Sequence, residues 1–360
     1  MTNSPLLYIG TYTKRGGQGI YLTRFDTTTG QIGEVTLAAE APNPSFLALH
    51  PSQPILYAVN EMVENGVRGN GMVSAFAIDA ASGGLTFLNQ QLTHGNSPCH
   101  LVVDATGSVV ISANYSSGNV AVMPIGADGR LQAASQVVQH EGSGINARRQ
   151  QGPRAHSVTI DQTNTFVYVC DLGIDKVMIY RLDTGNGKLI PNEAQNWARV
   201  TAGSGPRHFA FTPDRRFAYA INELDSTMNG FAFNAADGSL KDVCRLPTLP
   251  DGWDGSSHCA DVHVHPSGRF LYGSNRGHDS IAIYAIDQQS GALTSLGFAS
   301  TQGKTPRNFA IDPTGRWLLA ANQDTDNIFV YAIDEKTGAL TPNGQSAGAS
   351  MPVCLTFYGG

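Results

Sequence analysis

The chain has 360 residues, of which 41% are hydrophobic and 14% are charged, and its 23 Lys and Arg against 29 Asp and Glu give a formal net charge of −6. The hydrophobic share argues against wholesale disorder, and no apolar run approaches the roughly 20 residues that a membrane helix needs. Nucleic-acid binders carry a positive footprint, so the acidic balance argues against that partner. We therefore expect neither a membrane nor a nucleic acid as partner.

The first residues and the cysteines bear on the compartment. The segment Met1–Leu6 has neither the basic region nor the apolar region of a secretory signal. The five cysteines are odd in number, lie far apart and show no metal-ligand spacing, which favours buried thiols over disulfides. We therefore expect a cytoplasmic protein, and we expect it to be a monomer.

One sequence phrase recurs about every 50 residues along the chain. Each copy has alternating apolar residues, a turn with Asp or Asn and Gly, and a second apolar segment, which predicts a β-hairpin. In chain order the turns are Asp26 with Gly30, Asp79 with Gly84, Gly126 with Gly129, Asp183 with Gly187, Asn234 with Gly238, Asp287 with Gly291, and Asp334 with Gly338. Two more short strands precede each hairpin, and four strands per unit are typical of a β-propeller blade.

The two ends of the chain predict how the units join. The chain opens at the second strand of a unit, Leu7–Gly10, and ends with a lone first strand, Pro352–Phe357. Six complete units and these two fragments make seven blades. We therefore expect an all-β fold, a seven-bladed β-propeller with four-stranded antiparallel blades, formed by residues 1–360 as one domain. The C-terminal strand is expected to pair into the N-terminal blade and close the ring, which removes an exposed sheet edge.

Comparison of the units separates positions that repeat from positions that vary. Apolar residues along the first strand and an Asn or Asp ending the second strand repeat, which indicates roles in the blade itself. Two neighbouring positions at the start of the first strand vary among the units. The first position holds, in chain order, Ser45, Cys99, His156, Arg207, Ala260 and Arg307. The second holds Phe46, His100, Ser157, His208, Asp261 and Asn308. The position after the second strand also varies, and it reads Tyr12, Glu61, Tyr115, Leu172, Glu223, Arg276, Gln323.

Antiparallel pairing places the start of the first strand and the end of the second strand on the same face of the molecule. The charged residues at the variable positions are therefore expected around one mouth of the central channel. The longest connections, residues 62–71, 140–152 and 248–257, lie on that face as well. Long loops of this kind narrow the opening of a channel into a pocket, and ligand sites are found in such pockets.

Three arginines, Arg207, Arg276 and Arg307, are the candidates for holding an anionic ligand, because the planar guanidinium matches carboxylate and phosphate. Salt bridges between blades, to Glu223 and Asp261, are the alternative. The ligand interpretation is favoured because a buried cation without a partner is costly, and the three arginines outnumber the nearby acids, Glu223 and Asp261.

Two residues are candidates for moving a proton. Glu223 could act as a general base on water or orient a histidine, and the alternative is a plain ion pair. His156 titrates near the working pH and could also be the base, and the alternative is a hydrogen-bonded structural histidine.

Asp261, His263 and His265 alternate along one strand face, a pattern that a metal site can use. His265 and His50 both precede a Pro-Ser turn, which indicates that His265 is a turn residue, whereas His263 stands where other units have Ala or Thr. Clustered carboxylate ligands for a hard cation are missing. We therefore expect no metal and no other cofactor.

Four segments, Gly205–His208, Ile221–Leu224, Ala260–His263 and Ser274–Arg276, resemble motifs of the seven-bladed lactonase family, which includes propeller-type 6-phosphogluconolactonases and related fungal carboxy-cis,cis-muconate cyclases. The resemblance spans the whole chain. It implies hydrolysis of a small anionic sugar lactone, 6-phospho-D-glucono-1,5-lactone, in the pentose phosphate pathway. The functional His, Arg, Glu and Arg of the cyclase match His156, Arg207, Glu223 and Arg276.

Under this resemblance the site has two sets of residues. The catalytic set is His156, Glu223 and Arg276, with Arg276 stabilising the oxyanion. The substrate-binding set is Arg207, His208, Arg307, Asp261 and His263. Which of His156 and Glu223 is the base stays open, as do two other functions, a carboxymuconate-type cycloisomerase and a non-catalytic propeller that binds a sugar acid or a protein. The segment Asn146–Arg149 and the loop around Trp253 match no motif of the family.

Overall fold

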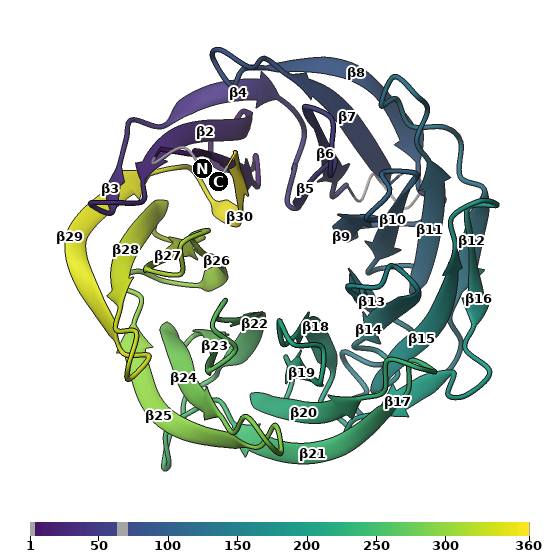
Figure 1. Ribbon diagram of the computed structural model, residues 1–360, viewed down its shortest axis with the longest axis vertical. Helices are drawn as coiled ribbons and strands as arrows, with labels where there is room; N and C mark the ends of the chain where they lie inside the picture. Colours follow the sequence, from purple (N-terminus) through teal and green to yellow (C-terminus); the bar gives the residue numbers. More distant parts are fainter. Residues whose placement is uncertain (1–3, 63–70, 360) are drawn as a thin grey trace. The chain divides into compact units, whose positions relative to one another are not determined.

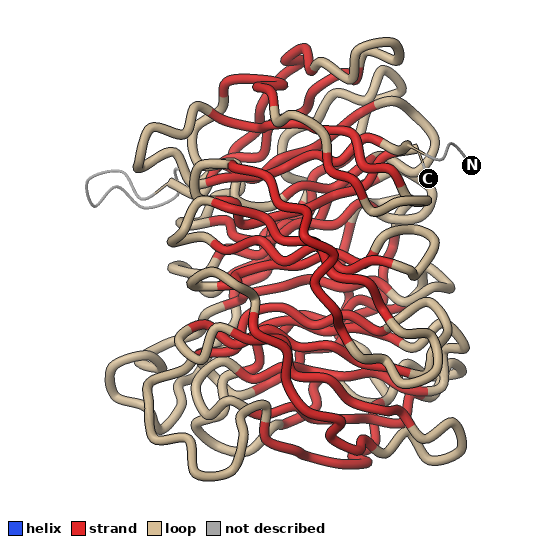
Figure 2. The backbone as a smooth tube through the Cα atoms, turned by 90° about the vertical axis from the view of Figure 1, so that its left-hand side faces the viewer, coloured by secondary structure: helices blue, strands red, loops and turns tan. Residues whose placement is uncertain are grey.

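The computed structural model describes residues 4–62 and 71–359, and within them the chain forms strands, turns and loops without a helix (Figure 2). The strands form seven antiparallel sheets of four or five strands (Figure 1), which confirms the seven predicted blades. The chain divides into two compact units, the first with residues 1–40, 210–232 and 241–360, and the second with residues 41–209 and 233–240. Most of the long connection at residues 62–71, which was predicted to border the channel opening, lies outside the described residues.

The N-terminal blade is built from both ends of the chain. Its strand order is β30-β1-β2-β3, and β4 also pairs with β2. These strands are β1 (Leu6–Thr11), β2 (Gly19–Asp26), β3 (Gln31–Ile32), β4 (Thr36–Glu40) and β30 (Pro352–Tyr358). Antiparallel pairing of β1 with β30 runs from Leu6 opposite Tyr358 to Thr11 opposite Pro352. The predicted pairing of the C-terminal strand into the N-terminal blade is confirmed, and it covers an edge of β1 that could pair with another chain.

The other six blades use strands that are consecutive in the chain. Three of them are β5 (Leu47–Leu49), β6 (Ile55–Asn60), β7 (Met72–Ile78), β8 (Leu85–Leu92); β9 (Pro98–Val103), β10 (Val109–Asn114), β11 (Asn119–Pro124), β12 (Gln136–Gln139); and β13 (Ala155–Ile160), β14 (Phe166–Asp171), β15 (Lys176–Asp183), β16 (Lys188–Pro191), β17 (Trp197–Arg199). The remaining three are β18 (Pro206–Phe211), β19 (Phe217–Asn222), β20 (Thr227–Phe233), β21 (Leu240–Pro247); β22 (His258–Val264), β23 (Phe270–Arg276), β24 (Ser280–Ile286), β25 (Leu293–Ser300); and β26 (Pro306–Ile311), β27 (Trp317–Asn322), β28 (Asn327–Ile333), β29 (Leu340–Gly348).

The core lies between the sheets and against the second strand of each blade. Strands β6, β10, β14 and β19 are buried at every residue. Strands covered on both faces are continuously apolar rather than alternating, as these are. One core cluster joins Val109 and Val122 to Val167 and Tyr180 of the next blade. Each large apolar side chain buried in this way contributes about 1.5–3 kcal/mol.

A buried tyrosine holds the recurring Asp-to-Gly turn. In one blade, Asp287 Oδ1 accepts hydrogen bonds from the main-chain N–H of Ser290 at 2.8 Å, and Gly291 closes the turn with a φ of 73°. The hydroxyl of the fully buried Tyr219 donates to the carbonyl of Gly291 at 2.9 Å. The same bond recurs from Tyr57 to Gly129, from Tyr168 to Gly238 and from Tyr272 to Gly338. The turn motif seen in the sequence is therefore also a contact between blades.

Gly291→Ala is expected to destabilise the fold by about 2–5 kcal/mol, because it combines a left-handed backbone with overpacking. An added Cβ would lie 2.3 Å from Cδ1 of Phe217. Gly344→Ala is the matched control, because its φ is 81° but nothing lies within 4 Å of the added Cβ, so about 1–2 kcal/mol is expected. The free energies of unfolding come from urea titrations. Equal losses in both variants would mean that Phe217 moves aside and that the overlap is unimportant.

Candidate active site

His156 is part of a cluster of rings in the second unit. It is the second residue of β13 and is 4% exposed. The Tyr115 ring meets it edge-on with 5.3 Å between ring centroids, and the His208 ring lies at 5.6 Å. From β9, Cys99 places its Sγ 3.8 Å from Nδ1 of His156 and 3.2 Å from its carbonyl oxygen. Packing against these three side chains fixes the imidazole in place.

Arg207 and His208 are neighbours on β18, and both are buried. Nη1 of Arg207 lies 3.1 Å from Nε2 of His208. Because a guanidinium has donors only, Nε2 of His208 is the acceptor in this contact. On its other side the His208 ring lies 5.2 Å from that of His100, which stacks on Phe46 at 3.9 Å. The predicted His156, Arg207 and His208 are therefore brought together.

Glu223 and Arg276 form a buried ion pair in the first unit. Glu223 follows β19 directly, and Arg276 is the last residue of β23. Arg276 Nη2 lies 2.9 Å from Glu223 Oε2, and the side chains are 15% and 6% exposed. The same guanidinium donates to the carbonyl of Cys259 at 2.9 Å. Burial lowers the pKa of Arg276, the Glu223 carboxylate raises it, and the charge of Arg307 lowers it again.

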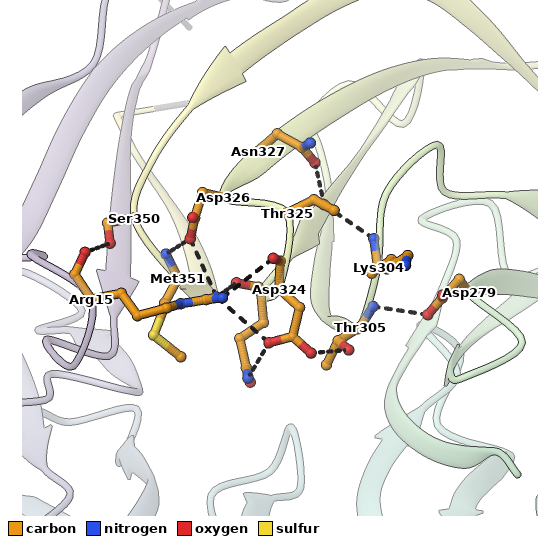
Figure 3. A network of polar contacts seen from close by, with 11 residues as sticks. Arg15, Asp279, Lys304, Thr305, Asp324, Thr325, Asp326, Asn327, Ser350 and Met351 are labelled. Atoms are coloured by element: carbon orange, nitrogen blue, oxygen red, sulfur yellow. Dashed lines mark hydrogen bonds and ion pairs between the residues drawn. The ribbon is translucent and has the colours of Figure 1, made fainter.

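Arg307 lies over the ring of Tyr12, with Cζ 5.4 Å from the ring centroid. Tyr12 directly follows β1, in the loop that also carries Arg15. Arg15 contacts the loop between β27 and β28 of the same unit (Figure 3). Nη2 of Arg15 lies 3.4 Å from Oδ1 of Asp326 and 3.6 Å from Oδ1 of Asp324. These side chains are exposed, so the ion pairs add little stability, but they orient the loop that carries Tyr12. Tyr12 in turn positions Arg307.

Asp261 connects the first strands of three blades. Its carboxylate accepts hydrogen bonds from the main-chain N–H of Val262 at 2.9 Å and from Nδ2 of Asn308 at 2.5 Å, and Nε2 of His263 lies 3.0 Å away. Asn308 Oδ1 then accepts from the main-chain N–H of Leu355 on β30 at 2.8 Å. Asp261 thus has a structural role between blades through its hydrogen bond to Asn308, a partner that the sequence did not predict, and the substrate contacts of Asp261 and His263 stay predictions.

The His263 side chain is expected to make a pH-dependent contribution to stability, through its contact with Asp261 at 3.0 Å. Burial is the largest single influence and lowers its pKa, but the charge of Asp261, the hydrogen bond to Asp261 and a hydrogen bond with the main chain of Phe309 together outweigh it, and the net direction is upward. The folded chain therefore binds this proton more tightly than the unfolded chain does. Its contribution to stability is complete below about pH 6.5, the unperturbed value, and is lost as the pH rises through the folded pKa.

Comparing His263→Gln with the wild type in urea titrations from pH 5.5 to 8.5 tests this contribution, because glutamine keeps a donor for Asp261 but does not titrate. The stability advantage of the wild type should shrink as the pH rises. His278→Gln is the control of opposite sign, because burial lowers the pKa of His278. Parallel wild-type and His263→Gln curves would contradict the predicted coupling to Asp261.

Two aromatic side chains of this region, His100 and Tyr115, were not among the site residues predicted from the sequence. His100 packs against His208, and Tyr115 packs against His156. Both stand at variable positions of the repeat, and that variation was the available signal. Of the predicted residues, the second unit holds His156, Arg207 and His208, and the first holds Glu223, Asp261, His263, Arg276 and Arg307. That both groups face one opening remains a prediction from strand order.

The structure also bears on the predictions about metal binding, membrane spans and cysteine thiols. Among residues 4–62 and 71–359, no group of three or more His, Cys, Asp and Glu is arranged to hold a metal ion, and no helix has the length and apolarity to span a bilayer. His265 Nδ1 lies 2.8 Å from Ser267 Oγ, as expected of a turn residue. All five cysteines are free thiols, and four of them are buried as predicted, whereas Cys244 is half-buried. Burial raises the pKa of Cys170 and of Cys259 to about 12.

Known proteins resemble this chain over nearly its whole length. A family profile described as lactonase, 7-bladed beta-propeller, matches residues 6–357, which confirms the predicted fold class. A 6-phosphogluconolactonase of Bacillus subtilis is 39% identical over 305 residues, 85% of this chain and 84% of the relative. One from Formosa agariphila is 33% identical over 309 residues, 85% and 86% of the two chains. The structure of a periplasmic gluconolactonase from Pseudomonas aeruginosa, PpgL, superposes with a TM-score of 0.92 at 33% identity, covering 99% of each chain.

Proposed function

Because this chain belongs to the seven-bladed β-propeller lactonase family, we propose that it hydrolyses 6-phospho-D-glucono-1,5-lactone to 6-phosphogluconate, a step of the pentose phosphate pathway. The observation that carries the proposal is the buried pair of Glu223 and Arg276 at 2.9 Å, with the charge of Arg307 acting on the same guanidinium. A carboxylate beside a fixed cation can supply both a base for water and a charge for an oxyanion. The substrate follows the names of the Bacillus subtilis and Formosa agariphila relatives.

In the proposed reaction, water attacks the lactone carbonyl carbon and gives up one proton to Glu223 or His156. The carbonyl oxygen becomes the oxyanion of a tetrahedral intermediate, and Arg276 stabilises it. Collapse of the intermediate breaks the bond from the carbonyl carbon to the ring oxygen. That oxygen takes the proton back and becomes the C5 hydroxyl, while the carbonyl carbon becomes a carboxylic acid. The ring ester is electrophilic enough for this route to need no cofactor.

The remaining predicted residues bind the substrate in this proposal. Arg207 and Arg307 attract its negative charge, and His208, which contacts Arg207 at 3.1 Å, lies against a sugar hydroxyl. Asp261 and His263 line the site and keep Asn308 in place. We expect the protein to act as a cytoplasmic monomer, since a phosphorylated sugar lactone is produced inside the cell.

A second substrate is favoured by one observation, the likeness to PpgL, which is described as a gluconolactonase. The test is an assay of the purified protein with three substrates: the phosphorylated lactone, D-glucono-1,5-lactone and carboxymuconate. The rate is followed by proton release or by the absorbance of the lactone, and the rate of spontaneous hydrolysis is subtracted. The proposal requires a kcat/KM for the phosphorylated lactone at least about 100-fold above that for gluconolactone, which equals roughly 2.7 kcal/mol of transition-state binding. The reverse order would make the protein a gluconolactonase. Turnover of carboxymuconate alone would make it a cycloisomerase, and no turnover would leave a binding protein.

A further inference from the structure

Neighbouring blades of the second unit are joined by a paired amide contact at three places. In each, an Asn or Gln side chain of one blade bonds both the main-chain N–H and the main-chain carbonyl of a leucine in the next blade. The N–H of Leu131 donates to Oδ1 of Asn89 at 3.0 Å, and its carbonyl accepts from Nδ2 of Asn89 at 2.8 Å. The same two bonds join Gln136 to Leu189 and Gln195 to Leu240. Each leucine stands two residues after the glycine of the recurring turn.

In the first unit, the corresponding position of β25 has no side chain. Asn89 lies beside the break in register between β7 and β8, and Gly297 lies at the same place in the pairing of β24 with β25. The leucine of the next blade is Leu340 on β29. It also stands two residues after a turn glycine, Gly338, whose carbonyl accepts from a buried tyrosine of the blade that carries Gly297. Gly297 therefore has nothing with which to make the paired amide contact to Leu340.

The main-chain polar groups of Leu340 point away from its own blade. Leu340 lies opposite Ile333 in the antiparallel pair of β28 and β29, but the N–H of Ile333 donates to the carbonyl of Arg316 at 2.8 Å. Opposite residues of an antiparallel pair exchange either both hydrogen bonds or none, so Leu340 exchanges none with Ile333. Within residues 4–62 and 71–359, no other group bonds the N–H or the carbonyl of Leu340. One donor and one acceptor are thus directed to the same side without a protein partner.

A cavity of about 500 Å³ lies at this place, between the two blades. Its lining is mostly apolar and includes Ile283, Leu296, Phe298, Ala299, Leu340 and Pro342. A Cβ added to Gly297, between two of these residues, would meet no atom within 4 Å. Small-molecule sites have volumes of about 300–1,000 Å³ and are apolar with a few placed polar groups. This cavity has that size, and the N–H and carbonyl of Leu340 are polar groups of that kind.

We propose that this cavity binds a small molecule with a primary carboxamide on a compact apolar ring. The carboxamide oxygen accepts from the N–H of Leu340 and the carboxamide NH₂ donates to the Leu340 carbonyl, which are the two bonds that Asn and Gln side chains make in the second unit. The ring packs against Leu296 and Phe298. A carboxylate has no donor for the carbonyl, so the site prefers an amide to the acid. This binding does not depend on the lactonase reaction.

Benzamide is the probe, and acetophenone, in which a methyl group replaces the NH₂, is the matched control compound. Each is titrated into wild-type protein labelled with ¹⁵N-leucine, and the amide resonance of Leu340, assigned by its absence in Leu340→Ile, is followed by NMR. Benzamide should shift this resonance with a Kd of about 1 mM or below. Acetophenone should bind about 5- to 10-fold more weakly, because it leaves the Leu340 carbonyl without a donor. Benzamide should also raise the thermal midpoint with increasing concentration, since it binds only the folded chain.

Ala299→Phe tests the location, because Ala299 lines the cavity and a phenyl ring there takes the space of the benzamide ring. It should weaken benzamide binding at least about 10-fold. Ser295→Phe is the control, since Ser295 is an exposed residue of the same strand outside the lining, and its Kd should stay within about twofold of wild type. Thermal unfolding shows whether both variants are folded, and if Ala299→Phe is not, the two compounds compared on wild type decide. No shift of Leu340 at about 10 mM benzamide, equal binding of both compounds, or unchanged binding by folded Ala299→Phe would overturn the proposal.

Discussion

Glu223→Gln is expected to lower kcat for the phosphorylated lactone by about 10²- to 10⁴-fold, the range of a general base, with KM changed by less than about threefold. Glutamine keeps the shape of the side chain and can still face Arg276, but it cannot take a proton from water. The matched control is Asp225→Asn, two residues further along the same turn. Asp225 pairs with Arg245 at 2.6 Å on the surface, so its loss should leave kcat unchanged.

Unchanged activity in Glu223→Gln would remove Glu223 from the chemistry and leave His156 as the base. The pH profile of kcat/KM distinguishes the two, since a general base must be unprotonated and its loss removes the fall in rate on the acid side. This acid limb is therefore compared between wild type and Glu223→Gln. His156→Asn completes the comparison, because only the loss of the true base abolishes that limb of the profile.

Arg276→Met is expected to destabilise the protein by about 3–5 kcal/mol, because breaking a buried ion pair removes a charge partner from a buried carboxylate. Both side chains of the pair are mostly buried, with exposures of 15% and 6%, so solvent screens the contact little. Activity should fall as well, since removing one oxyanion donor costs about 10²- to 10³-fold in kcat. Urea titrations give the stability, and the lactone assay gives the rate.

The double variant Glu223→Gln with Arg276→Met separates these two effects. With both charges gone, the buried carboxylate that had lost Arg276 is gone too, so the double variant should regain much of the stability lost by Arg276→Met alone. It should stay inactive. Additive stability losses in the double variant would show that the two side chains act independently, and recovered activity would exclude both from the chemistry.

The fold could be predicted because its signals are local and occur seven times. An alternating apolar segment, an Asp-containing turn and a glycine identify a hairpin wherever they occur, as at Asp287 and Gly291. The lone segment at 352–357 had to pair with the N-terminal blade, since it was a first strand without a second. The same repetition exposed the variable positions, where His156, Glu223 and Arg276 stand. The connections at residues 140–152 and 248–257 gave no such signal, since neither follows the repeated pattern.

What the sequence determined by itself is thus the architecture and the set of candidate side chains, because both follow from patterns within single blades. Only the tertiary structure decided the partners. Glu223 takes Arg276, Asp261 takes Asn308, and Arg149 reaches Tyr115. Each pair is separated by more than 30 positions in the printed sequence. Such contacts depend on how whole sheets twist and pack, and a difference of about 1 Å decides whether a hydrogen bond forms.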